Sequence, residues 1–208
     1  MPSASRSQIV SGVEYDVYPP PAMLIKATQR CWAEEMLRSG RMRFGAIWSY
    51  QAWESHLLGD PDDGRGILTL GDRDYTTESA NPVFAWCAAL PSIAQEHLRE
   101  LASANKYDCL VRIHSPPTLI NRIRESAVGQ RLWPHCANAT YDKRSKVSDL
   151  SSLNSRRLDF HIFQKDNRFS PDCEYRIALI DISQQGRAEE SLFLSIGDCS
   201  DILSLEPI

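Results

Sequence analysis

The stretch of sequence that decides the fold is residues 174–182, Glu-Tyr-Arg-Ile-Ala-Leu-Ile-Asp-Ile. Its apolar run from Ile177 is typical of a buried β-strand. Residues 163–173 before it are dense in charge and include a proline, so they predict a loop that leads into the strand. Asp172 and Glu174 lie two positions apart at the start of the strand, and such side chains leave the same face. We therefore expect a pair of carboxylates there that could act in catalysis.

Similar patterns along the chain predict a domain in which strands outnumber helices. Runs with strand character fall at residues 22–27, 41–48, 67–70, 82–90, 107–113, 158–164 and 191–196. Apolar stripes with helical spacing follow Thr28, Ser92 and Ser115, whereas residues 130–155 are polar and fit no element. Several strands have short links, but a parallel sheet needs a helical crossover at nearly every step. We expect an α+β fold with a mixed, largely antiparallel sheet flanked by helices, and the pattern is compatible with a split in that sheet.

The length of 208 residues suits one domain, which we expect to span residues 13–208. Residues 1–12 are polar and lack the apolar core of a signal peptide, so they predict a mobile tail of a cytoplasmic protein. The longest apolar runs are much shorter than the ~20 residues of a membrane span. The formal net charge of −4 argues against bulk attraction to nucleic acid or to an anionic membrane.

Several common enzyme motifs are absent from the sequence. It contains no P-loop, no Gly-x-Gly-x-x-Gly, no His-Glu-x-x-His and no Gly-x-Ser-x-Gly. Its six cysteines are widely spaced and form no Cys-x-x-Cys pair, which favours reduced thiols over a zinc site. The simplest forms of nucleotide hydrolysis, Rossmann redox chemistry, zinc proteolysis and lipase-type hydrolysis are therefore not expected.

An acidic loop at residues 54–66 offers a second kind of site. Glu54, Asp60 and Asp63 could bind a divalent metal, with Lys165 as a polarising base, and this set would suit a metal-dependent nuclease. The spacing differs from that of a calcium loop, whose ligands alternate and end in a glutamate. A solvated turn is the simpler alternative, because glycine, proline and aspartate favour turns.

Two further pairs of charged residues each share one face of a predicted strand. Arg41 and Arg43 could grip a diphosphate or nucleic acid, because guanidinium groups bind phosphate with two hydrogen bonds. They could equally bridge the acidic loop as surface side chains. Glu174 and Arg176 could form a structural ion pair on the sheet, which is the alternative to a catalytic Glu174.

Three segments together resemble a known superfamily. Residues 23–50 read as an apolar strand with a lysine, a helix, and then Leu-x-x-Gly-x-x-Arg-Phe-like spacing; residues 82–90 read as a central strand; residues 165–179 read as Lys-Asp-x-x-Phe, an acidic pair and Glu-Tyr-Arg. This combination resembles a broad group of uncharacterised bacterial proteins, some found near mobile or phage-defence genes. It also looks distantly like the ADP-ribosyltransferase superfamily.

The resemblance implies a split antiparallel sheet that grips NAD, with Glu174 as the catalytic carboxylate and Asp172 orienting the acceptor. Lys26 stands where that superfamily has an arginine or histidine for the cofactor, and no Ser-Thr-Ser follows in the second strand. Tyr50 and Tyr141 are the candidates for the partner of the nicotinamide.

Three hypotheses of function follow. In the first, the protein uses NAD to transfer ADP-ribose to a macromolecular acceptor, a protein or a nucleic acid, in a bacterial toxin or phage-defence context. Glu174 and Asp172 are then catalytic, and Lys26, Arg41, Arg43 and Tyr50 bind the cofactor. The second is the metal-dependent nuclease built on residues 54–63. The third is a non-enzymatic module that senses a nucleotide or binds a partner.

Overall fold

The computed structural model describes residues 6–10, 13–17, 19–51, 59–70, 72–141, 144–147, 160–186 and 189–208. Its helices are α1 (Arg30–Ser39), α2 (Ile47–Gln51), α3 (Gln95–Ala104), α4 (Pro116–Val128) and the 3₁₀ helices η3 (Phe160–Phe163) and η4 (Asn167–Asp172). The strands of the main sheet are β3 (Leu24–Thr28), β4 (Arg41–Ala46), β7 (Val83–Ala89), β8 (Cys109–Ile113), β9 (Leu132–Asn138), β11 (Glu174–Asp181), β12 (Ser191–Ser195) and β13 (Leu203–Pro207).

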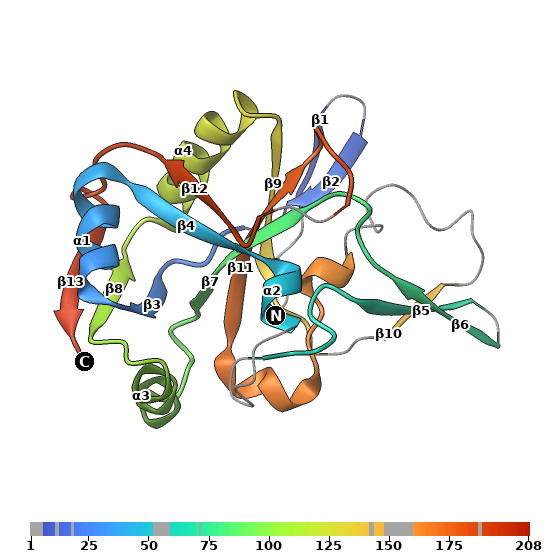
Figure 1. Cartoon of the computed structure of the whole chain (residues 1–208), viewed down its shortest axis with the longest axis horizontal. Helices are drawn as coiled ribbons and strands as arrows, with labels where there is room; N and C mark the ends of the chain where they lie inside the picture. Colours follow the sequence, from blue (N-terminus) through green and yellow to red (C-terminus); the bar gives the residue numbers. More distant parts are fainter. Residues whose placement is uncertain are drawn as a thin grey trace.

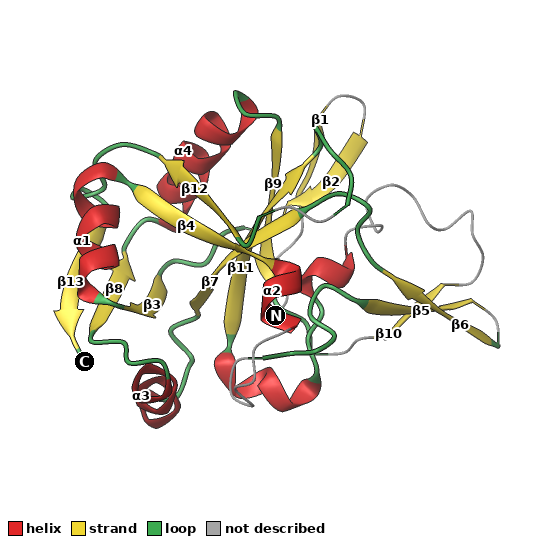
Figure 2. Cartoon of the chain, viewed as in Figure 1, coloured by secondary structure: helices red, strands yellow, loops and turns green. Residues whose placement is uncertain are grey.

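Eight strands form the main sheet, in the order β12-β4-β7-β3-β8-β13, and β11 and β9 join it beside β7 (Figure 1). Every strand pairing in this sheet is antiparallel. Helices lie on both of its faces and at its margins (Figure 2). The expected α+β fold with a largely antiparallel sheet is therefore confirmed.

The sheet divides at β7. Along one edge, β7 pairs with β11 over its whole length, from Val83 to Ala89. Along the other edge it pairs with β4 at Phe84 and Ala85, and with β3 only at Ala89. β3 and β4 diverge from each other beyond these contacts, as Figure 1 shows. Residues 86–88 of β7 consequently face a notch between the two halves of the sheet.

The two faces of the sheet carry different cores. On one face, Trp86 of β7 and Ile177 of β11 pack against the apolar stripes of α1 and α4. On the other, Ala178 and its neighbours pack against Ile47 of α2 and Ile162 of η3. Because side chains alternate along β11, Glu174 and Arg176 project from the face of the smaller second core.

Local signals that the sequence carried clearly are confirmed. α1 ends at Gly40, whose φ of 61° is in the left-handed region that favours glycine. Ser115 precedes α4 and prolines occupy its first turn, where a missing backbone N–H is harmless. The hydroxyl of Ser115 does not cap a backbone N–H of α4 and instead shares a hydrogen bond with the hydroxyl of Thr118 (2.8 Å).

One strand prediction is wrong entirely, and another is wrong at its end. Residues 160–163 form the 3₁₀ helix η3 in place of the expected strand 158–164, of which 158 and 159 lie outside the described residues. A single 3₁₀ turn already buries Ile162 in the second core. Four residues with this pattern are therefore compatible with a strand as well as with a 3₁₀ helix. The strand expected at 41–48 ends at Ala46, because α2 begins at Ile47.

The strand expected at residues 67–70 is confirmed, and further strands lie where no element was expected. β9 falls inside the polar segment 130–155 and contains Pro134. Among the described strands it pairs only with β11, and proline is tolerated on such an edge strand. β5 (Gly66–Leu70) pairs with β6 (Arg73–Thr77) antiparallel and with β10 (Arg144–Val147) parallel, in a separate sheet.

The N-terminal segment includes a hairpin. Of residues 1–12, which the sequence predicted to be a mobile tail, Arg6–Val10 form β1 and pair antiparallel with β2 (Val13–Val17). Among the described residues, no helix is long and apolar enough to cross a membrane.

Candidate functional site

A cavity of about 560 Å³ opens at the notch where the sheet divides. β3, β4 and β7 line it together with parts of α1 and α3, the start of β11 and the end of η4. The six residues that the first hypothesis of function names contribute to its lining: Lys26, Arg41, Arg43, Tyr50, Asp172 and Glu174. Positions separated by as many as 148 residues in the chain (174 − 26) thus converge on one cavity.

Lys26 and Tyr50 cap the backbone of β7 inside the notch. The ammonium of Lys26 donates a hydrogen bond to the carbonyl of Cys87 (2.7 Å), and the hydroxyl of Tyr50 donates to the carbonyl of Ala85 (3.3 Å). A carbonyl that lacks its ladder partner needs such a donor when it is buried. Burial lowers the pKa of Lys26 and raises the pKa of Tyr50. Gly45 allows this approach, because a Cβ there would collide with the Tyr50 hydroxyl.

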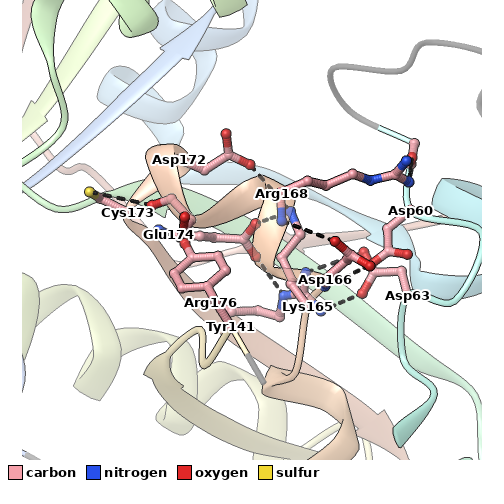
Figure 3. A network of polar contacts seen from close by, with 12 residues as sticks. Asp60, Asp63, Tyr141, Lys165, Asp166, Arg168, Asp172, Cys173, Glu174 and Arg176 are labelled. Carbon is pink, nitrogen blue, oxygen red and sulfur yellow. Dashed lines mark hydrogen bonds and ion pairs between the residues drawn. The ribbon is translucent and has the colours of Figure 1, made fainter. Parts of the chain in front are cut away.

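Glu174 is buried and held by two cations (Figure 3). Its Oε2 accepts a hydrogen bond from Nζ of Lys165 (2.8 Å), and its Oε1 accepts one from Nε of Arg176 (2.7 Å). Its backbone N–H donates to the hydroxyl of Tyr141 (2.7 Å). Burial alone would raise the pKa of the carboxyl group, but Arg176 and Lys165 outweigh it and hold that pKa well below its usual range. The site therefore keeps a fixed negative charge.

Arg176 joins the acidic loop to Glu174. Its Nη1 and Nη2 donate to the two carboxylate oxygens of Asp63 at 2.7 and 3.2 Å, and Nη1 also donates to the carbonyl of Ile162 (2.6 Å). Only 1 % of the Arg176 side chain is exposed. Burial would lower the pKa of Arg176, but the carboxylates of Asp63 and Glu174 raise it well above its usual value, so the guanidinium stays charged. The acidic loop and the Glu174 site are one network.

Asp172 reaches this network by a different route from the one that the sequence suggested. It ends η4, and Cys173 then adopts a left-handed conformation (φ 46°), so Asp172 does not share the face of β11 with Glu174. Its Oδ2 instead lies 3.4 Å from Nζ of Lys165, and its Oδ1 lies 2.8 Å from Nε2 of His97. The two carboxylates are brought together by one ammonium group, not by strand alternation.

In the described part of the acidic loop, the carboxylates of Asp60 and Asp63 bond to neighbouring parts of the protein. Oδ1 of Asp60 accepts from the backbone N–H of Asp62 (3.0 Å), and its Oδ2 accepts from that of Asp166 (3.4 Å). Asp63 is occupied by Arg176 through both oxygens, and Glu54 lies outside the described residues. No group of three or more His, Cys, Asp or Glu residues among those described could hold a metal ion. These loop carboxylates act here as hydrogen-bond acceptors.

The guanidinium groups of β4 lie on the opposite edge of β7 from β11. Exposed and buried side chains alternate along β4, so Arg41 and Arg43 share its exposed face, as expected. Arg41 pairs with Glu35 (3.2 Å) and stacks over the ring of Phe193 (4.5 Å to its centroid). Within the described ranges, Arg43 makes neither a hydrogen bond nor an ion pair. Arg43 is thus available to a ligand in the cavity.

The low pKa of Glu174 predicts a loss of stability in acid. A carboxyl group with a folded pKa below its unfolded value stabilises the fold fully above about pH 4.5, and this contribution is lost as pH falls towards the folded pKa. We expect the free energy of unfolding, from urea titrations, to fall more steeply between pH 5 and pH 3 for the wild type than for Glu174→Gln. Equal slopes in the two proteins would contradict this assignment.

His97 and the double role of Lys165 were not identified as site features from the sequence. Tyr141 was a candidate for the partner of the nicotinamide, and the structure instead places its hydroxyl on the backbone N–H of Glu174. His97 is 75 positions from Asp172 in the chain, and no spacing rule connects a helix residue with a loop so distant. Lys165 was considered only as part of a nuclease, although its place in the charged segment before β11 was a usable signal. In comparisons with known proteins, no family model, no curated protein and no solved structure matches the chain.

Proposed function

We propose that the protein is an ADP-ribosyltransferase-like enzyme, which cleaves NAD and transfers ADP-ribose to a macromolecular acceptor. One observation carries the proposal: the cavity at the split of the sheet holds a fixed carboxylate, Glu174, and a pair of guanidinium groups, Arg41 and Arg43. These groups match the two charged parts of the reaction, a cationic sugar centre and an anionic diphosphate. The distant resemblance of residues 165–179 to that superfamily supports the same function.

Glu174 would act on the sugar. When nicotinamide leaves, positive charge develops at C1′ of the ribose, and a preorganised negative charge stabilises that centre. Each oxygen of Glu174 receives one hydrogen bond and can accept another, so the carboxylate can also hold a ribose hydroxyl. Lys165 and Arg176 fix its orientation before the substrate binds.

Arg41 and Arg43 would act on the diphosphate. Guanidinium groups bind phosphate oxygens in a bidentate manner, and the strand keeps the two side chains on one face. The cavity volume of about 560 Å³ falls within the range of roughly 300–1,000 Å³ that is usual for small-molecule sites. Tyr50 and Trp48 also line the cavity and offer aromatic surface beside it.

Exchange of Arg43 for glutamine tests the diphosphate contact. We expect the Kd for NAD, from isothermal titration calorimetry, to rise about tenfold, as for the loss of one charge-assisted hydrogen bond. Arg38→Gln is the matched control, because Arg38 lies on α1, is 77 % exposed and pairs only with Glu34 among the described residues. An equal Kd in Arg43→Gln and the wild type would remove Arg43 from the site.

Nicotinamide release tests the function as a whole. The purified chain is incubated with NAD, and nicotinamide is quantified by liquid chromatography. Release above the spontaneous rate supports the proposal. NAD binding with no release would indicate a nucleotide-binding module in place of an enzyme. If NAD is not bound and no nicotinamide is released, the proposal is overturned.

A further inference from the structure

His97 lies directly behind Asp172 at the rim of the cavity. It occupies the first turn of α3, which packs against η4, and 19 % of its side chain is exposed. Its Nε2 lies 2.8 Å from Oδ1 of Asp172, while Nδ1 is 3.8 Å from Oε2 of the largely exposed Glu100. Asp172 lines the cavity itself. The imidazole is therefore placed to act on Asp172 and not on a ligand.

Asp172 is held from two sides. His97 contacts one carboxylate oxygen, and Nζ of Lys165 lies 3.4 Å from the other. Lys165 at the same time donates to Glu174 (2.8 Å), so the carboxylates of Asp172 and Glu174 flank one ammonium group. A carboxylate fixed in this way has little rotational freedom. Its two partners therefore also fix the directions of the lone pairs that they do not use.

We infer that His97 is a positioning residue, which orients Asp172 as the general base toward the acceptor nucleophile. This inference rests on the proposed function, because it concerns the second half of the same reaction. It implies that the acceptor attacks through a group that carries a proton, such as a hydroxyl, a thiol or water. A base within hydrogen-bonding reach of that proton is what such a nucleophile requires.

The reaction step balances without any further reactant. The bond between C1′ and the nicotinamide nitrogen breaks, and both of its electrons leave with nicotinamide. The oxygen of a hydroxyl acceptor or of water forms the new bond to C1′, and its proton passes to Asp172 and then to solvent. No group is oxidised or reduced.

A purely structural clasp between α3 and η4 is the competing role for His97. Two substitutions separate the roles. His97→Leu removes the donor to Asp172 and keeps the bulk of the side chain, whereas His97→Gln keeps an N–H donor. Azide provides the chemical test, since it attacks C1′ as an anion and has no proton to lose.

The experiment measures hydrolysis of NAD by the full chain, with and without sodium azide. We expect His97→Leu to hydrolyse NAD about 10- to 100-fold more slowly, within the range of general-base effects, with the Kd for NAD changed by less than about twofold. His97→Gln should retain at least about a third of the wild-type rate. Azide should restore NAD consumption in His97→Leu and Asp172→Ala and yield the azide adduct of ADP-ribose.

The matched control is His114→Leu. His114 is an exposed histidine on the loop after β8, held by the hydroxyl of Ser204 (2.7 Å), and its loss should leave hydrolysis unchanged. In the Asp172→Asn background, His97→Leu should have no further effect, because its role is exerted through Asp172.

The outcomes separate the inference from the proposed function. Wild-type protein that releases no nicotinamide overturns the proposed function, and this inference with it. Wild-type protein that hydrolyses NAD no faster than His97→Leu overturns the inference alone. The inference is also overturned if His97→Leu loses activity, His97→Gln loses it equally and azide does not restore it, since that result means that His97 has a purely structural role. If His97→Leu does not fold, the rates of His97→Gln and the azide response of Asp172→Ala decide the question.

Discussion

Nicotinamide release from NAD is expected to fall about 10²- to 10³-fold when Glu174 is replaced by glutamine. The amide has nearly the same shape and can still accept a hydrogen bond, but it lacks the negative charge opposite the developing positive charge at C1′. Lys165 and Arg176 would each lose one of their carboxylate partners but keep their positive charge beside that centre, which adds to the effect. The measurement is the steady-state rate of release together with the Kd for NAD, which should change far less than the rate.

The controls for Glu174→Gln address folding and charge. Glu206→Gln makes the same chemical change on β13, away from the cavity lining, where the half-buried Glu206 pairs with Arg112 (2.6 Å), and should leave the rate unchanged. Rates should be compared at a temperature at which both proteins are folded by circular dichroism. A variant that binds NAD and retains wild-type activity without this carboxylate would exclude Glu174 from the chemistry.

Replacing Arg176 by methionine is expected to lower the free energy of unfolding by about 3–5 kcal/mol. Arg176 is one of the most deeply buried side chains and is bonded to both Asp63 and Glu174. Methionine fills a similar volume but leaves Asp63 as a buried charge without its cation, and breaking a buried pair in this way is strongly destabilising. Urea unfolding followed by tryptophan fluorescence gives the free energy directly.

Two further variants sharpen the test of Arg176. Arg112→Met removes a partly exposed arginine from its ion pair with Glu206, and should change stability by less than about 1 kcal/mol. The double variant Asp63→Leu/Arg176→Met removes both partners, so it should be more stable than Arg176→Met alone. A loss below about 1 kcal/mol in Arg176→Met would mean that the network does not support the fold.

The fold could be predicted where side-chain pattern and backbone signals agree. β7 and β11 are nearly continuous apolar runs, and their central position follows from burial on both faces. β9 could not be predicted, because it carries Pro134 and polar residues and is held by its pairing with β11. η3 could not be told from a strand, since its few apolar residues fit either conformation.

The candidate site could be predicted only in part, for a related physical reason. Local spacing indicates which residues share a strand, as with Glu174 and Arg176 or with Arg41 and Arg43. It contains no information on contacts made by loops, so the salt bridge between Asp63 and Arg176, 113 positions apart, was not foreseen.

The notch in the sheet bears on aggregation as well as on ligand binding. An unpaired strand edge is a template onto which another chain can add, and proteins often guard such edges with a lysine. The interrupted edge of β7 lies inside the molecule, with Lys26 and Tyr50 bonded to its carbonyl groups. The break in the sheet thus forms a pocket, and the unpaired edge of β7 is not exposed to pairing with other protein chains.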